Sequence, residues 1–194
     1  MRLEAGTRVE YLSSAWMIVE VLVSIVSGLM AGSLALLAFG GDSVIELISG
    51  FVVLTHLRGR KDSELGGERA GRITTALLFC LIPVIGLGAV YSFASGLRPE
   101  RSPLGIGMAL GAVIVMPYLY FQKKRIGEET STMALKTDAI ESVTCLFMSI
   151  ALLGGLISEY FFGLWWVDYL ATGVILAFVA REALGSYHEL HEEK

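Results

Sequence analysis

The sequence predicts an all-α membrane protein, a bundle of six transmembrane helices with both termini in the cytoplasm. Of its 194 residues, 54% are hydrophobic and only 18% are charged, whereas soluble domains carry about 25% charged residues. Apolar runs long enough to cross a bilayer recur six times along the chain. We expect a single transmembrane domain over residues 1–194, with spans near residues 11–30, 34–57, 73–96, 103–122, 130–157 and 164–184.

Small and rigid residues indicate how the expected helices are joined and packed. Residues 28–33 form a glycine-containing turn between the first two spans, which predicts an antiparallel hairpin. Pro83 and Pro117 lie inside the third and fourth spans, where neighbouring helices can satisfy the backbone groups that proline leaves unpaired. Gly107 and Gly111 have the small-xxx-small spacing of a close helix contact. These features favour packing roles for the four residues.

Lys and Arg residues gather at one end of the expected bundle. At this end lie Arg2, Arg8, Arg58, Arg60, Lys61, Arg69, Arg72, Lys123, Lys124, Arg125, Arg181 and Lys194, of which Lys123 to Arg125 form the loop after the fourth span. The opposite end has only Arg98 and Arg101. The positive-inside rule therefore predicts cytoplasmic termini, in a bacterial-type inner or plasma membrane. Residues 1–11 indicate no removable signal peptide, and no basic patch indicates a nucleic-acid partner.

Two carboxylates interrupt the second apolar span. Asp42 and Glu46 are four residues apart, so a helix places them on one face, one turn from each other. Each ionised side chain near the bilayer centre costs about 2.5–3.5 kcal/mol on insertion scales, and the two charges also repel. A bound cation is the simplest compensation. Asp42 and Glu46 are therefore candidate metal ligands.

A third carboxylate lies at a similar depth in the first span. Glu20 is about 13 Å from the cytoplasmic end of its span, whereas Asp42 and Glu46 are about 12 and 18 Å from the outer end of theirs. In a hydrocarbon core of about 30 Å, Glu20 falls at a depth between the other two. Glu20 is a further candidate ligand. The alternative is a hydrogen bond from Glu20 to a serine or a backbone group of the bundle.

The fifth span adds two more acidic residues. Asp138 and Glu141 lie about 10 and 14 Å from its cytoplasmic end and can both face the bundle as i and i+3 neighbours. Cys145 is on the Asp138 face but about 10 Å further along the axis, so it can share an ion with Glu141 and not with Asp138. A small buried hydrophobe is the favoured role for Cys145, with accessory ligand as the other. Lys136 can reach the interface or neutralise a nearby carboxylate while no metal is bound.

Two acidic residues belong to the sixth span. Asp168 lies near its outer end, where an accessory port residue and a helix-end cap are both compatible with the position. Glu182 is adjacent to Arg181 and is expected to form an interfacial ion pair with it.

Two stretches resemble the transmembrane domain of the cation diffusion facilitator family. Residues 28–37, followed by Asp42 and Glu46, resemble the family's first hairpin, in which two acidic residues of the second helix bind a divalent metal. Residues 134–142 resemble the family's fifth helix and imply that Asp138 is a ligand. The resemblance covers residues 10–185 approximately. It implies six spans, both termini inside, and a homodimer.

Two departures from the family pattern bear on the site and its regulation. Ala134 stands where the fifth helix usually supplies His or Asp, which leaves Glu141, Glu20 or water as the fourth ligand. The chain ends soon after the sixth span, so it resembles the short branch that lacks a cytoplasmic metal-sensing domain. The motif at residues 165–168 and the acidic residue in the first helix also resemble that branch. Regulation and dimer contacts are then expected within the membrane.

These observations predict a transporter that exports a divalent cation in exchange for protons, with no prosthetic group. Oxygen ligands without histidine suit Mn²⁺ or Fe²⁺, whereas Zn²⁺ and Co²⁺ more often recruit imidazole; the family resemblance favours Zn²⁺, so the metal stays open. The alternatives are a non-transporting membrane assembly or scaffold protein and a proton-coupled exporter of organic cations that uses Glu20 alone. An enzyme is not expected, because no Ser-His or His-Glu-x-x-His arrangement occurs.

Overall fold

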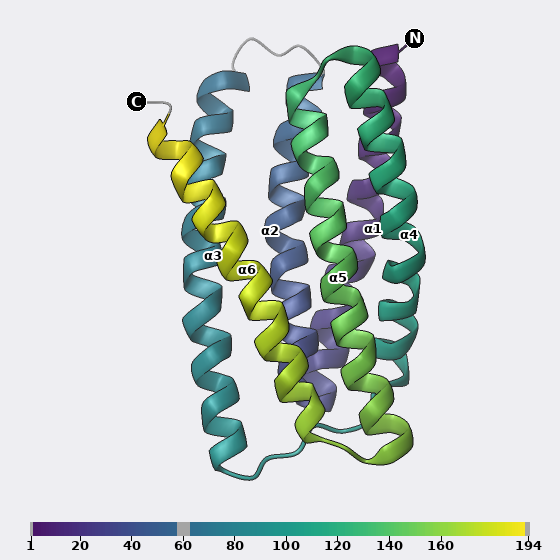
Figure 1. Ribbon diagram of the computed structural model, residues 1–194, viewed down its shortest axis with the longest axis vertical. Coiled ribbons are helices and arrows are strands. Elements are labelled where there is room, and N and C mark those ends of the chain that lie inside the picture. The colour runs from purple at the N-terminus through teal and green to yellow at the C-terminus, as the bar shows by residue number, and fades with distance from the viewer. Residues whose placement is uncertain (1, 58–62, 193–194) are drawn as a thin grey trace.

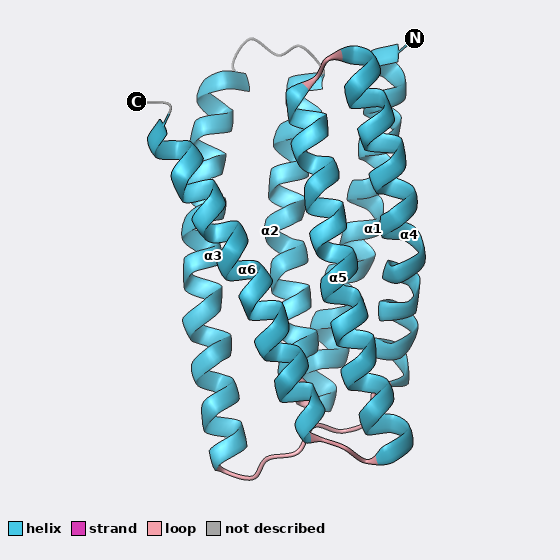
Figure 2. Ribbon diagram, in the orientation of Figure 1, coloured by secondary structure: helices cyan, strands magenta, loops and turns pink. Residues whose placement is uncertain are grey.

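The computed structural model describes residues 2–57 and 63–192, and these residues form six helices and no strand (Figures 1 and 2). In chain order the helices are α1 (Arg2–Ala31), α2 (Leu34–Leu57), α3 (Ser63–Ala94), α4 (Pro103–Thr130), α5 (Met133–Phe162) and α6 (Trp166–Glu192). The all-helical prediction is confirmed. Most helices extend beyond the apolar runs, because polar residues that flank a run continue the same helix.

Five of these helices are long and apolar enough to cross a membrane, namely α1 to α5. The helix α6 is not among them, since Asp168 and the Arg181–Glu182 pair bracket its apolar stretch. It nevertheless packs along the bundle and contacts α2, α3 and α5 (Figure 1).

The predicted hairpin of the first two helices is present. Helix α1 ends at Ala31, and Gly32 makes the turn in the left-handed conformation (φ 64°). Ser33 then begins α2, because its hydroxyl accepts a hydrogen bond from the Leu36 amide at 3.2 Å. Gly28 allows the close approach of the two helices, since a Cβ there would lie 2.9 Å from Leu37 Cδ2.

The bundle is organised around α2, which contacts α1, α3, α5 and α6. Helix α4 packs against α1 and α5 on the opposite side of the bundle from α3 (Figure 1). Both ends of the chain lie at the same end of the bundle, as an even number of antiparallel passes requires (Figure 1).

Polarity in this bundle is inverted relative to a soluble protein. Large apolar side chains cover the outside, and Leu29, Leu87 and Ile114 are each about 70% exposed. Acidic and basic side chains instead lie inside, and among the described residues seven of them are at most 1% exposed: Glu10, Glu20, Asp42, Glu46, Lys123, Asp138 and Asp168. This distribution is typical of a bundle whose solvent is lipid and whose interior carries the chemistry.

Two expectations about α4 need correction. Lys123 was expected in a loop, but α4 continues to Thr130 and the Lys123 side chain is fully buried. Gly111 makes the predicted close helix contact, since a Cβ there would lie 2.7 Å from Trp16 of α1. Gly107 does not, because a Cβ there would meet no other described residue within 4 Å. The lipid-facing position of Gly107 explains the difference.

Candidate metal centre

Three buried side chains from three helices converge in the bundle interior. Glu20 of α1, Glu46 of α2 and Cys145 of α5 each offer one ligand atom, and these atoms lie within 4.8 Å of one another. All three residues are buried. Two carboxylates and a sulfur at this separation can coordinate one divalent cation, and we refer to Glu20, Glu46 and Cys145 as the central cluster.

Hydrogen bonds orient the carboxylate of Glu20. Trp16, one helical turn earlier in α1, donates from its indole nitrogen to Glu20 Oε1 at 2.6 Å. Ser43 of α2 places its hydroxyl oxygen 3.4 Å from Glu20 Oε2. Gly111 of α4 leaves the space that the Trp16 ring occupies. The alternative role for Glu20, a hydrogen bond with a serine, is therefore compatible with the structure. Glu20 also lies beside the other potential ligands.

Asp42 and Glu46 have no comparable partners. None of their four carboxylate oxygens has a hydrogen-bond partner in the described part of the chain, although both side chains are buried. Asp42 interacts electrostatically with Glu20 and Glu141, and Glu46 interacts with Asp42 and Glu20. Buried polar atoms are normally paired. Orphaned carboxylate oxygens close to other acidic groups need either a proton or a cation as their partner.

Cys145 belongs to the central cluster although a packing role was favoured for it. It is fully buried, and it interacts electrostatically with Glu46, Glu20 and Asp42. Its axial position along the fifth span predicts that Cys145 can share an ion with Glu141 and not with Asp138. No local pattern in α5 indicates its closeness to Glu46, which depends on how α5 is positioned against α2.

Asp138 lies in a different group of charges. Lys123 Nζ is 2.6 Å from Asp138 Oδ2 and 3.9 Å from Glu10 Oε2, and all three side chains are buried. We refer to Glu10, Lys123 and Asp138 as the lysine cluster. The structure therefore separates Asp138 from the ligand atoms of the central cluster.

Glu141 lies between the two clusters on α5. It accepts a hydrogen bond from the Ser49 hydroxyl at 3.4 Å, and its other oxygen has no partner among the described residues. It interacts electrostatically with Asp42 on one side, and with Asp138 and Lys123 on the other. Ala134, one turn before Asp138, lies among residues whose side chains the structure does not describe.

Glu10 and Lys123 were not identified as buried residues from the sequence, yet a signal for each exists. Buried residues of α1 recur with helical spacing, in the series Glu10, Ser13, Met17, Glu20, Ser24 and Ser27. Lys123 continues the buried series Met116, Leu119, Lys123 and Ile126 of α4. If the helical spacing of the buried residues in α1 and α4 is continued along each helix, it predicts that Glu10 and Lys123 also face the bundle interior.

Asp168 lies at the end of the bundle opposite the chain termini, away from both clusters. Its Oδ1 accepts a hydrogen bond from the Ser33 hydroxyl at 2.6 Å. The backbone amides of Leu34 and Ala35 also interact with its carboxylate, so Asp168 contacts the N-terminus of α2. This geometry supports the helix-end role, in which Asp168 of α6 caps the N-terminus of the neighbouring helix α2. The buried Glu159 of α5 interacts with Asp168 and was not singled out from the sequence.

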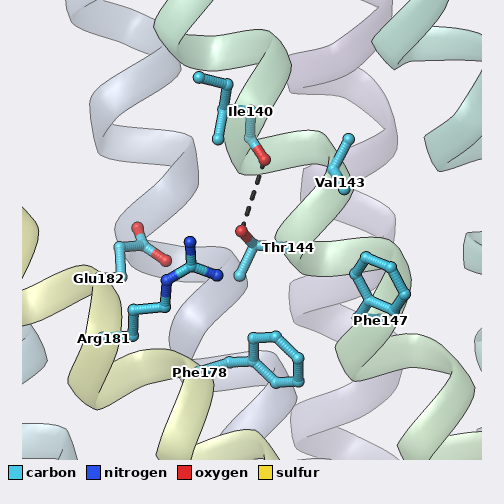
Figure 3. A pocket seen from close by; sticks show the side chains of 7 residues that line it. All are labelled: Ile140, Val143, Thr144, Phe147, Phe178, Arg181 and Glu182. Atoms are coloured by element: carbon cyan, nitrogen blue, oxygen red, sulfur yellow. Dashed lines mark hydrogen bonds between the residues drawn. The ribbon is translucent and has the colours of Figure 1, made fainter.

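A pocket of about 360 Å³ opens between α5 and α6 (Figure 3). It is lined by Ile140, Val143, Thr144, Phe147, Phe178, Arg181 and Glu182. None of the ion pairs found among the described residues joins Glu182 to Arg181, contrary to expectation. Glu182 instead interacts electrostatically with Asp42 and Glu46, because it lies between the pocket and the interior acids.

The model of the cation efflux transmembrane domain matches residues 11–189. The chain belongs to the cation efflux family. The resemblance to cation diffusion facilitators is thereby confirmed. Membership identifies the chain as an integral membrane protein from a family of metal cation transporters.

Two relatives of this cation efflux chain come from Bacillus subtilis (strain 168). The chain is 24% identical to the manganese efflux system protein MneS over 196 residues, which cover 96% of this chain and 67% of MneS. It is 24% identical to the uncharacterized transporter YdbO over 175 residues, or 86% of this chain and 60% of YdbO. The chain thus spans about two thirds of the length of MneS and less of YdbO.

Proposed function

We propose that this protein exports a divalent metal cation and binds it between Glu20, Glu46 and Cys145. Asp42 contributes negative charge to the same position. The convergence of the three buried ligand atoms within 4.8 Å carries the proposal, because no other described group of His, Cys, Asp and Glu residues meets that spacing. Glu141 lies on α5 between this position and the lysine cluster, to which Asp138 belongs.

Mn²⁺ is the first substrate to test. Carboxylate oxygens suit Mn²⁺ and Fe²⁺, whereas the thiol of Cys145 adds a ligand that Zn²⁺ and Co²⁺ accept readily. The relative MneS carries manganese efflux in its name. Competition among Mn²⁺, Fe²⁺, Co²⁺ and Zn²⁺ for binding therefore shows whether the carboxylate oxygens or the Cys145 thiol decide the order of affinities.

Protons are the proposed counter-ion. A carboxylate binds either a proton or a metal ion, so metal binding at Glu20 and Glu46 releases protons and weakens as the pH falls. Exposure of one buried site first to the cytoplasm and then to the other side would couple the two flows. In this proposal each chain crosses the membrane six times, with α6 as the sixth span and both termini in the cytoplasm. The working assembly is a homodimer.

The test is metal flux into proteoliposomes that carry a metal-sensitive dye and a pH gradient. We expect Glu46→Gln to reduce Mn²⁺ affinity at least tenfold, roughly the cost of removing even an outer partner of a metal ligand. The matched control is Glu129→Gln, because Glu129 is exposed and pairs with Arg125 on the surface of α4. Wild-type flux in Glu46→Gln would contradict the proposal.

Metal binding to the detergent-solubilised protein separates a transporter from a scaffold. A transporter should be stabilised by Mn²⁺ and should release protons on binding it. An assembly or scaffold protein should show neither effect. Flux of an organic cation that Glu20→Gln abolishes and Glu46→Gln leaves intact would favour the organic-cation exporter instead.

A further inference from the structure

The lysine cluster contains a positive charge that the proposed transport site does not use. Lys123 is fully buried between helices of a bundle whose outer surface is apolar, in the part of α4 that is nearer to the chain termini. An unpaired ammonium in such a place costs several kcal/mol, so its partners must compensate for burial. Lys123 has two carboxylate partners, Asp138 and Glu10.

The surroundings of Lys123 are built from four helices. Glu10 comes from α1, Lys123 from α4 and Asp138 from α5. Helix α2 contributes Gly50, where a Cβ would lie only 2.8 Å from Glu10 Oε1, so the absence of a side chain makes room for the carboxylate. The carboxylates of Glu10 and Asp138 therefore meet at one point, and the Lys123 ammonium occupies it.

The charge balance of the lysine cluster depends on one proton. With Glu10 and Asp138 both ionised, two carboxylates and one ammonium leave one negative charge among buried groups, which a proton can neutralise, whereas a divalent cation in place of the ammonium would neutralise both carboxylates. The carboxylate oxygens of Glu10 and Asp138 have no further hydrogen-bond partner among the described residues. Glu141 interacts with this cluster as well as with Asp42, so the lysine cluster adjoins the central cluster.

We propose that Lys123 is a tethered cation, which fills a second cation-binding position between Glu10 and Asp138 and so limits the bundle to one divalent ion. The proposal rests on the proposed function, because that one ion is the substrate in the central cluster. Lys123 thereby takes the neutralising role that was one of two alternatives for Lys136. It keeps Asp138, a ligand in the family pattern, from binding metal.

The experiment counts Mn²⁺ ions bound per chain by equilibrium dialysis of the full-length protein in detergent. Wild type should bind one ion and Lys123→Met should bind two, since methionine keeps the length of the side chain and removes its charge. Lys124→Met is the matched control and should bind one, because Lys124 is exposed and interacts with Tyr120 and Glu128, neither of which belongs to the lysine cluster. Equal counts in wild type and Lys123→Met would overturn the proposal.

A double variant distinguishes this proposal from the proposed function. Lys123→Met with Glu46→Gln should keep one ion, at Glu10 and Asp138, and Lys123→Met with Glu10→Gln should return to the wild-type count. If wild type binds no Mn²⁺, the proposed function fails, while a single ion in Lys123→Met would still support the tethered cation.

Stability of the single variant gives a second readout should Lys123→Met fold poorly. Two unneutralised carboxylates should make the variant depend on Mn²⁺, so that it is monodisperse with the metal and aggregates on chelation, whereas wild type tolerates chelation. Equal aggregation of Lys123→Met with and without Mn²⁺ would overturn the proposal.

Discussion

Cys145 introduces a soft ligand atom into a group of carboxylates. Its sulfur lies within 4.8 Å of a ligand oxygen of Glu20 and of Glu46, in a position closed to solvent. Thiolates favour Zn²⁺ over Mn²⁺, while carboxylates bind both. At the scale of single residues, Cys145 is therefore expected to affect which metal is bound more than whether a metal is bound.

Substitution of Cys145 tests this expectation. We expect Cys145→Ala to weaken Zn²⁺ binding by about tenfold and to change Mn²⁺ binding by less than about twofold, because only the softer ion depends on sulfur. Competition dialysis of the two metals measures both affinities. Cys80→Ala, the same change at an exposed cysteine, should alter neither. A parallel loss of both metals would show that Cys145 supports the site by packing.

At the scale of elements, α1 and α4 are coupled through a glycine and an indole ring. Gly111 provides the space for Trp16, and Trp16 in turn donates a hydrogen bond to Glu20 at 2.6 Å. A contact between two helices thus determines the orientation of a candidate ligand. The helix α4 contributes no ligand to the central cluster, yet its packing is expected to influence metal binding.

A valine at position 111 should break this connection. The Cβ of Gly111→Val would overlap Trp16, and overpacking of this kind costs about 1–3 kcal/mol. We expect a lower apparent melting temperature together with weaker Mn²⁺ binding, measured on the same detergent-solubilised sample. Gly107→Val is the control, since nothing described lies within 4 Å of that position. Equal effects of both substitutions would argue against the role of Trp16.

At the scale of the whole molecule, the bundle surrounds its charges with helices and presents apolar side chains outward. Both chain ends lie at one end of the bundle (Figure 1). Such an arrangement agrees with six passes through the membrane, in which α6 completes the even number. The carboxylates are then shielded from lipid by neighbouring helices, which is how ionisable residues persist within membranes.

Topology reporters test the membrane arrangement. Reporters that are active only in the cytoplasm should be active when fused to either terminus, and inactive when inserted in the turn at residues 96–102 between α3 and α4. The reason is the excess of Lys and Arg at the end of the bundle that carries the termini. A reporter that is active at one terminus and inactive at the other would place the termini on opposite sides of the membrane, which would mean that α6 does not cross it.

The sequence alone determined the helical class, the hairpin of the first two helices and the acidic interior. Hydropathy, turn glycines and the spacing of Asp42 and Glu46 are local properties, and each helix carries them regardless of its neighbours. The period of the buried faces also held information on Glu10 and Lys123, which lie outside the apolar runs. Of these two residues only Lys123 was singled out, in the loop after the fourth span.

Only the tertiary structure decided which buried groups meet. The family resemblance implied that Asp138 shares a site with Asp42 and Glu46, but the side chains that actually approach one another depend on the rotation and axial offset of each helix. Those two quantities are set by packing against several neighbours, such as Trp16 against Gly111 and Glu10 against Gly50. They bring Cys145 to Glu46, and they give Asp138 a lysine from α4 as its partner.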